Sequence, residues 1–278
     1  MMNPEEHDRK ITNHYLHRLL DLQATQYREQ LLLTRKKYED PYSLNRFEHE
    51  IYSQCGEDGI IDEIFRRIGT TNRYFMEFGA GNGLQNSTAA LLLKNWVGAW
   101  IEANPRNTEV IREKYASLLM KHRLTLLETF ITAENIEELF EKLDAPESFD
   151  LLSIDIDGND YWVWKSITRY RPGVIVCEYN PRFGSDCKWV MKYNPAHSWN
   201  GSMYYGASLK SLELLGREMG YKLVACNLAG VNAFFVRDDL VGSHFSPPFT
   251  AEFHYEPQRH FLLKAPAPPS DFGDFVPV

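Results

Sequence analysis

Three closely spaced glycines follow a short apolar run in the first third of the chain. The run is 74–78, and Gly79, Gly81 and Gly83 come directly after it. Its aromatic and apolar side chains suit a buried parallel strand, and glycines at the turn let a ligand approach the backbone. The N–H groups that begin the next predicted helix, 87–94, would point at the same turn. The sequence therefore predicts a site for a polar or anionic group there.

Acidic or amide side chains also follow three other predicted strands. Each strand is a short apolar run, and the polar residues come at or just after its end: Glu102 after 98–101, Asp155 and Asp157 after 151–154, and Glu178 and Asn180 after 174–177. Open α/β sheets bind ligands at the carboxyl ends of their parallel strands. We therefore expect these side chains to share one edge of the sheet with the glycine turn.

These side chains suggest two kinds of binding. A carboxylate at the position of Glu102 suits the vicinal hydroxyl groups of a ribose. Hard oxygen ligands that suit Mg²⁺ better than zinc are offered by the other four positions, Asp155, Asp157, Glu178 and Asn180. The alternative for these four residues is a hydrogen-bonded polar pocket without a metal.

The stretch 182–206 mixes aromatic and polar residues without a clear period. It is predicted to form a substrate loop at the same edge, where α/β enzymes build specificity. Aromatic faces among polar groups suit a sugar or another hydroxylated ligand, although a local hydrophobic cluster would have the same composition. Within this loop His197 is a candidate general base by its location, and Asp157 is a second candidate.

The spacing of the glycines separates two classes of cofactor. A dinucleotide-binding turn needs G-x-G-x-x-G, whereas this chain has G-x-G-x-G, with Leu84 where the third glycine belongs. With Glu77 two residues before the first glycine, the stretch resembles class I S-adenosylmethionine-dependent methyltransferases. The resemblance implies that Glu102 holds the ribose and that Asp155 lies near the sulfonium. It also implies that the methionine end is held by the strand-one acid and the glycine loop, Glu77, Gly79, Ala80, Gly81 and Asn86.

Two further motifs resemble the FkbM-type branch of these methyltransferases. One is Ser-Gln-Cys-Gly-Glu-Asp at 53–58, which the resemblance places over the cofactor with Gln54 as a contact. The other is the acid-x-acid-Gly pattern at 155–158. Metal-dependent O-methyltransferases carry an acid after strand four and an acid–Asn pair after strand five. In this chain Tyr179 separates the acid from Asn180, which is a departure from that pattern.

The predicted fold is a Rossmann-like, three-layer α/β sandwich with a seven-stranded, mainly parallel sheet. Its last two strands, 221–226 and 231–237, are joined by a short connection, which favours an antiparallel pair. In the class I order the last strand lies between strands five and six. The methyltransferase domain is predicted over 51–244, after an N-terminal helical extension, 1–50, and before a proline-rich tail, 245–278.

The N-terminal extension is predicted to contain one long helix over 12–38 that carries a leucine stripe. The stripe would pack on the domain or on a second copy of the chain, which would make a homo-oligomer. A membrane surface is a less suitable partner, because the polar face of the helix mixes acids with bases.

The composition limits the classes of partner. The chain has 278 residues and a formal net charge of -8, so we expect no nucleic-acid partner, which would need clustered Lys and Arg. Its four cysteines form no C-x-x-C pair, which fits reduced thiols and no zinc site. The N-terminus lacks a signal-peptide pattern, and no apolar run approaches about 18 residues. We therefore expect a cytoplasmic protein without a membrane partner.

Together these features predict methyl transfer from S-adenosylmethionine to an oxygen of a small hydroxylated acceptor, such as a sugar or a glycan precursor, with Mg²⁺ as a candidate aid. Two alternatives stay open at this point. One is an NAD-dependent oxidoreductase, which the missing third glycine disfavours. The other is an S-adenosylmethionine-binding partner protein without an activity of its own, which the crowded acids disfavour.

Overall fold

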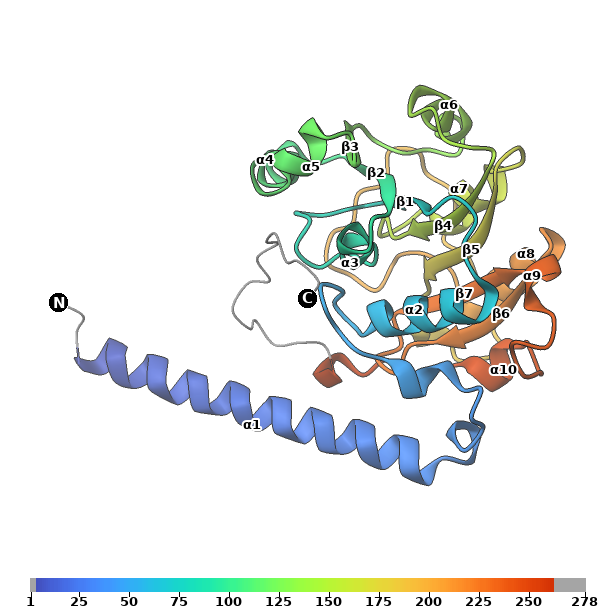
Figure 1. The fold of residues 1–278 in the computed structure, drawn as a ribbon. Helices are drawn as coiled ribbons and strands as arrows, with labels where there is room; N and C mark the ends of the chain where they lie inside the picture. The colour runs from blue at the N-terminus through green and yellow to red at the C-terminus, as the bar shows by residue number, and fades with distance from the viewer. Residues whose placement is uncertain (1–3, 263–278) are drawn as a thin grey trace.

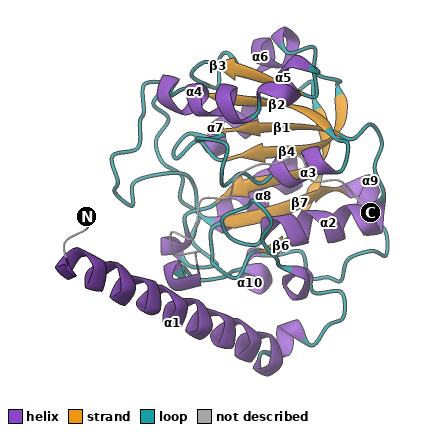
Figure 2. Ribbon diagram, turned by 60° about the vertical axis from the view of Figure 1, so that its left-hand side comes forward, coloured by secondary structure: helices purple, strands orange, loops and turns teal. Residues whose placement is uncertain are grey.

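The computed structural model describes residues 4–262, and its centre is one seven-stranded sheet (Figure 1, Figure 2). The strands lie in the order β3-β2-β1-β4-β5-β7-β6. Strand β7 pairs antiparallel with both β5 and β6, and the other pairings are parallel. The predicted seven-stranded, mainly parallel, Rossmann-like sheet with an antiparallel last strand is confirmed. The strand bounds are β1 (Tyr74–Phe78), β2 (Val97–Glu102), β3 (Leu124–Glu128), β4 (Ser148–Ile154), β5 (Arg171–Glu178), β6 (Tyr221–Cys226) and β7 (Asn232–Arg237).

Different helices cover the two faces of the sheet. Alternate residues of each strand point to opposite faces, so Phe75 and Leu151 lie in one core and Met76 and Leu152 in the other. The first core is covered by α2 (Glu57–Ile68), α3 (Ala89–Leu93), α4 (Pro105–Lys114), α5 (Ala116–Met120) and α9 (Asp238–Val241). The second is covered by α6 (Ile136–Lys142), α7 (Asp160–Ser166), α8 (Leu209–Glu218) and α10 (Ala251–His254). The predicted three layers are therefore present.

The N-terminal extension is dominated by α1 (Pro4–Thr34), which projects from the body of the protein (Figure 1). The helix predicted over 12–38 therefore begins earlier and ends earlier, because a 3-10 turn, η1 (Lys36–Tyr38), follows it. The C-terminal part of α1 packs on the body, where Leu31 is buried in one cluster with Leu228 and Leu262. The extension continues through a second 3-10 turn, η2 (Leu44–Phe47), to the domain.

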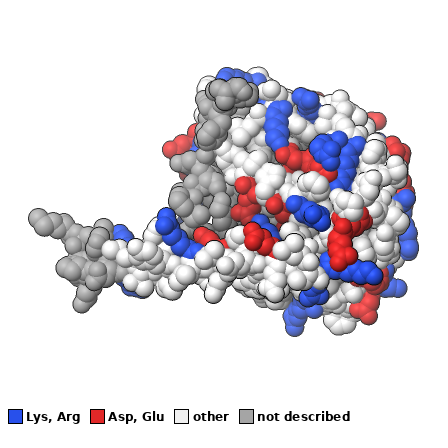
Figure 3. All heavy atoms as spheres, turned by 60° about the horizontal axis from the view of Figure 1, so that its bottom comes forward, with Lys and Arg blue, Asp and Glu red and all other residues white. Residues whose placement is uncertain are grey.

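The rest of α1 carries an exposed apolar stripe, made of Ile11, Tyr15, Leu16, Leu19, Leu20 and Leu22. Figure 3 shows basic and acidic side chains interspersed on this helix and on the face of the body beside it. The stripe is the surface that pairing with a second copy would use, and that pairing stays a prediction. Among the helices within residues 4–262, none has the length and apolar character that a membrane crossing requires.

The described part of the predicted tail packs on the body of the protein. Phe245, Ala251 and Leu262 are buried, and a short 3-10 turn, η4 (His260–Leu262), ends this part. The buried carboxylate of Glu256 pairs with Arg259 at 2.8 Å. The remainder of the predicted tail, 263–278, lies outside the described residues.

The turn after β1 brings two strand ends into close contact. At Gly79, where φ is 72°, a Cβ atom would lie 1.7 Å from the carbonyl oxygen of Asp155 at the end of β4. Gly81 also has a positive φ, 53°, but a Cβ atom there would meet no described atom within 4 Å. The absence of a side chain at Gly79 therefore allows the strand ends to pack, whereas Gly81 borders open space.

Substituting these two glycines should separate packing from strain. Gly79→Ala should lower the free energy of unfolding by about 3 kcal/mol or more, because it adds a backbone clash to the strain of a positive φ. Gly81→Ala should lower it by only about 1–2 kcal/mol, since it adds the strain alone. Urea denaturation followed by circular dichroism measures both. Equal losses in the two variants would contradict the close approach of β1 and β4.

Candidate cofactor and acceptor site

A cavity of about 1030 Å³ lies at the carboxyl ends of the central parallel strands. A smaller hollow of about 180 Å³ adjoins it. Both spaces are lined by Gln54, Gly79, Gly81 and Asp155, so they form one continuous site. The larger cavity adds the predicted residues Glu102, Asp157, Glu178 and His197. The smaller hollow adds the predicted residues Glu77, Ala80 and Asn86.

Glu102, the last residue of β2, connects the two turns that border the cavity. Its Oε2 accepts a hydrogen bond of 2.7 Å from the N–H of Gly81, and its Oε1 accepts one of 2.7 Å from the N–H of Asn104. The side chain is buried, yet each carboxylate oxygen keeps a second lone pair for a ligand. The glycine turn and the strand-two acid thus face the same space, as the sequence predicts.

Glu77 holds the segment that leads into α3. Its carboxylate accepts hydrogen bonds from the N–H of Ser87 at 2.9 Å, from the hydroxyl of Thr88 and from the amide of Asn86 at 3.3 Å. The indole N–H of Trp100 donates to the same Thr88 hydroxyl at 2.8 Å. Glu77 therefore shapes the smaller hollow through its neighbours, and a direct contact with a cofactor stays a prediction.

Asn86, which lines the smaller hollow, has an unused hydrogen-bond acceptor. Its Nδ2 donates to the carbonyl oxygen of Ala80 at 3.0 Å, while its Oδ1 is buried without a hydrogen-bond partner. Buried acceptors are normally satisfied, so an unpartnered one in a cavity wall is suited to a donor from a ligand.

The wall of the smaller hollow also contains two buried polar residues that are outside the predicted site set, Glu57 and Asn232. Glu57 accepts hydrogen bonds from the N–H of Cys55 at 2.8 Å and from the amide groups of Asn227 at 2.9 Å and Asn232 at 2.8 Å. The Gly-Glu-Asp motif was the available signal for Glu57, but acids are also common at helix starts. The following acid, Asp58, does serve locally, because it accepts three backbone N–H groups from 51–53.

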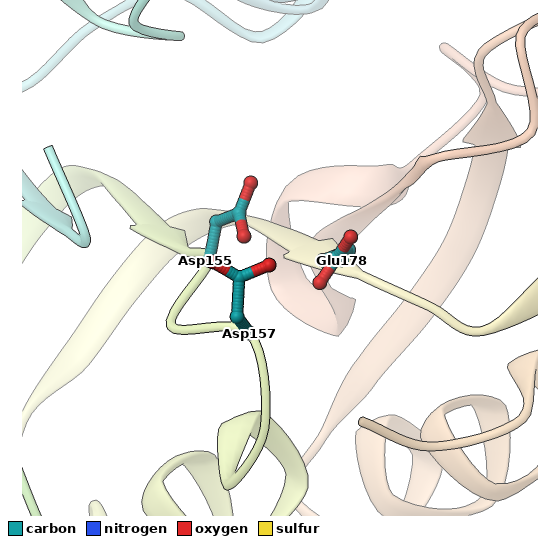
Figure 4. Close-up of side chains that lie close together, drawn as sticks. All are labelled: Asp155, Asp157 and Glu178. Carbon is teal, nitrogen blue, oxygen red and sulfur yellow. The ribbon is translucent and has the colours of Figure 1, made fainter. Parts of the chain in front are cut away.

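Three carboxylates meet at the ends of β4 and β5 (Figure 4). Asp155, Asp157 and Glu178 each offer one oxygen, and these oxygens lie within 4.8 Å of one another. Burial raises the pKa of Asp155 and of Glu178 well above the usual range. The charge of Asp157 raises the pKa of Asp155 further, and the charge of Asp155 raises the pKa of Glu178 further. The Oε2 atom of Glu178 is buried without a partner. This oxygen set fits either a hard cation or shared protons.

The turn that carries these acids is held by its neighbour Asp160. The carboxylate of Asp160 accepts hydrogen bonds from the N–H groups of Ile156 at 2.8 Å and Gly158 at 2.9 Å. Within this turn Asp157 adopts a left-handed φ of 53°, which an aspartate tolerates better than most residues. Asp160, the first residue of α7, therefore holds the turn that precedes its helix, and Asp157 is left exposed at the cavity.

His197 lies beside this turn, although it is 40 residues away in the chain. A Cβ atom on Gly158 would lie 2.4 Å from its Cδ2, so the ring packs directly on that glycine. Its Nε2 is buried without a hydrogen-bond partner. Burial raises the pKa of Asp157, the charge of Glu102 raises it further, and the neighbouring His197 lowers it. The two predicted proton acceptors are thus brought together.

Asn180 is predicted as a metal ligand, but its amide is engaged with the substrate loop. Its Nδ2 donates to the carbonyl oxygens of Met203 and Tyr205, both at 3.0 Å. Its Oδ1 accepts from the N–H of Arg182 at 3.2 Å, where it caps the 3-10 turn η3 (Pro181–Phe183). The structure therefore shows Asn180 as the anchor of the loop, and its role as a metal ligand stays a prediction.

The pH dependence of stability should report on Glu77. Burial raises its pKa to about 7, whereas an unfolded glutamate ionises near about 4.3. Between these values the folded protein holds a proton that the unfolded chain has lost, so the free energy of unfolding should fall as pH rises from about 4.5 to about 7. Urea denaturation at a series of pH values should show a flatter slope for Glu77→Gln.

Glu128→Gln is the control for that experiment. Hydrogen bonds from Thr108 and Arg112 lower the pKa of Glu128, so this residue is ionised in both states over the same range. Its replacement should leave the slope unchanged. Parallel curves for the natural chain and Glu77→Gln would show that Glu77 is ionised in the folded protein at pH 5.

No protein-family model matches this chain, and no curated protein matches its sequence. Solved structures with a similar fold include a protein named as an O-methyltransferase from Klebsiella pneumoniae, with 16% identity and a TM-score of 0.45 over 79% of this chain and 97% of that one. A protein named as a caffeoyl-CoA O-methyltransferase from Staphylococcus aureus has 13% identity and a TM-score of 0.46 over 78% of this chain and 100% of that one. Both likenesses are remote.

Proposed function

We propose that this protein is an S-adenosylmethionine-dependent methyltransferase that acts on an oxygen of a small hydroxylated acceptor. The observation that carries the proposal is the 2.7 Å hydrogen bond from the N–H of Gly81 to the carboxylate of Glu102. It holds the glycine turn and the strand-two acid against one cavity, so that a single elongated ligand can contact both. The G-x-G-x-G spacing and Glu77 select this donor over a dinucleotide.

The polar groups of the site suit the methionine end of the donor. The unpartnered Oδ1 of Asn86 can accept from the ammonium group, and the open space at Gly81 admits the chain between its two ends. Side chains that can donate to the carboxylate line the smaller hollow, Gln54, Gln85 and Ser87. Gln54 also borders the larger cavity, which supports the finer assignment to the FkbM-type branch.

The larger cavity suits the nucleoside end and the acceptor. The remaining lone pairs of Glu102 can accept from both ribose hydroxyls. Beyond the end of β3 the wall is made by Thr129, Phe130 and Ile131, which can border an adenine. The substrate loop adds Trp199 and Tyr205, whose rings are suited to the apolar face of a sugar or a related polyol.

When bound, the donor supplies a methyl group that its sulfonium already activates. The protein must then align the acceptor oxygen with that methyl carbon and remove the proton of the hydroxyl group. His197, which lines the cavity, and the exposed carboxylate of Asp157 beside it are the two groups that can take this proton. Asp160 and Asn180 act indirectly, because they hold the turn and the loop that carry these two groups.

The proposal also includes, as a more specific point, a divalent ion bound beside the acceptor. Asp155, Asp157 and Glu178 are an all-oxygen set that fits Mg²⁺, and the unpartnered Oε2 of Glu178 supports this use. When bound there, Mg²⁺ would lower the pKa of an acceptor hydroxyl. The methyl-transfer proposal does not depend on the ion, since Asp157 and His197 can take the proton without it.

Calorimetry tests donor binding. S-adenosylmethionine should bind the natural chain, and Glu102→Ala should weaken binding about 10–100-fold, because it removes a charged acceptor of two ribose hydrogen bonds. Glu128→Ala is the matched control, since this acid ends the adjacent strand and bonds instead to Thr108 and Arg112. Absence of binding, or equal binding by the natural chain and Glu102→Ala, would remove the proposal, as would saturable binding of NADH.

The metal is tested separately from the chemistry. Mn²⁺ titration followed by electron paramagnetic resonance should show one bound ion, and Glu178→Gln should weaken its binding at least about tenfold by removing a charged ligand. Glu128→Gln should leave the affinity unchanged. Methyl transfer that survives exhaustive EDTA treatment would dismiss the metal and leave the methyltransferase proposal standing.

A further inference from the structure

We infer that the acceptor reaches this site without a negatively charged group. It would be a free hydroxylated molecule, and not a phosphate ester, a nucleotide conjugate, a carboxylic acid or a coenzyme A thioester. The inference rests on the proposed function, because it concerns the second ligand of the same cavity. It is argued from the charges of the side chains that line the cavity, and from the hydrogen bonds that already engage the backbone N–H groups around it.

The wall of the larger cavity is strongly acidic. Its carboxylates belong to four residues, Glu102, Asp155, Asp157 and Glu178. Among the described residues that line this cavity none is Lys or Arg, and the single titratable base is His197. Phosphate and carboxylate groups are bound in proteins mainly by such cations or by free backbone N–H groups, whereas the carboxylate of the proposed donor is accompanied by the donor's own ammonium and sulfonium charges. The described wall therefore lacks the cationic side chains that would bind such a group.

The backbone N–H groups at the strand ends are largely taken by the protein's own acids. Glu102 accepts the N–H groups of Gly81 and Asn104, and Asp160 accepts those of Ile156 and Gly158. These are the turns from which an α/β site would offer donors to an anion. An anionic acceptor would therefore have to displace a buried carboxylate to reach them.

The basic residues of the substrate loop do not compensate. Arg182, Lys188 and Lys192 are all exposed, and none of them lines the cavity. The loop thus contributes aromatic, amide and hydroxyl groups to the wall and keeps its described cations outside it. Loops that bind nucleotide or coenzyme A conjugates need the opposite arrangement, because those conjugates carry several negative charges.

The charge of the wall is large enough to select between acceptors. Two like unit charges about 8 Å apart, in a site with an effective dielectric constant of about 20, weaken binding roughly 30-fold. A phosphate ester would meet several such carboxylates. A divalent ion on Asp155, Asp157 and Glu178, or protons held by Asp155 and Glu178 because their pKa is raised, would reduce this charge, and either would still leave no cationic side chain in the described wall.

What the wall does offer suits an uncharged polyol. The lining of the cavity includes the rings of Trp199 and Tyr205, the amide side chain of Gln258 and the hydroxyl of Ser202. Aromatic faces next to hydrogen-bonding groups match the apolar faces and hydroxyl edges of sugars. The wall thus contains the contacts that a neutral hydroxylated acceptor needs.

The experiment follows the charge of the methylated product. The purified full-length protein is incubated with S-adenosylmethionine labelled in its methyl group and with an ultrafiltered small-molecule extract of the organism that carries the gene. Labelled products are then passed over an anion exchanger at pH 8. We expect at least nine-tenths of the protein-dependent label in the flow-through, after the donor itself has been removed on a cation exchanger.

The outcomes separate the inference from the proposed function. Label that is retained by the anion exchanger, and that alkaline phosphatase or a nucleotide pyrophosphatase releases, would overturn the inference and support methyl transfer. Retained label that resists both enzymes would do the same, because it indicates a carboxylate. No protein-dependent label, from a protein that binds the donor in calorimetry, would overturn the proposed function and the inference with it.

A pair of variants provides the control. Lys188→Ala combined with Lys192→Ala removes two exposed cations outside the cavity, and it should leave the rate of labelling within twofold. A loss of more than tenfold with unchanged donor affinity would show that these lysines attract an anionic acceptor, and it would overturn the inference. Gln258→Lys adds a cation to the wall, and only this variant should be inhibited by inorganic pyrophosphate.

Discussion

The hydrogen bond between the Gly81 N–H and the Glu102 carboxylate is the contact on which the rest of the site depends. A buried carboxylate is stable only if donors replace its lost water, and the N–H groups of Gly81 and Asn104 supply them. These donors belong to the turn after β1 and to the loop after β2. The acid therefore fixes two turns relative to each other, and the shape of the cavity follows from their separation.

The crowding of acids at the ends of β4 and β5 opposes stability. Burial raises the pKa of all three acids, the charge of Asp157 raises the pKa of Asp155 further, and the charges of Asp155 and Asp157 raise the pKa of Glu178 further. Asp160, with the same side chain as two of them, shows the structural alternative, because its carboxylate is satisfied by two backbone N–H groups. Acidic groups that repel one another at a cavity and have shifted pKa values are typical of functional sites.

The sheet was predictable because buried parallel strands are continuous apolar runs, and the predicted bounds of β1 coincide with the observed ones. Because the acids follow the ends of these parallel strands, their position at the carboxyl edge of the sheet was also predictable. The partners of buried polar groups were not predictable, since Glu57 bonds to Asn232, 175 residues away, and Asn180 bonds to carbonyl oxygens in an irregular loop. The bounds of α1 were also missed, because its apolar residues extend beyond the part that packs on the body.

The position of β7 links the cavity to the order in which the chain can assemble. Strand β5 carries Glu178, and this residue pairs with Asn232 at the start of β7, so one side of β5 stays an open edge until the polypeptide has been synthesised past that point. An open edge next to an apolar strand invites pairing with other chains. Most of the ligand-binding residues are therefore synthesised before β7 can cover the edge of β5. Completion of the sheet then depends on the β5–β7 pairing, which joins residues far apart in the sequence and forms late.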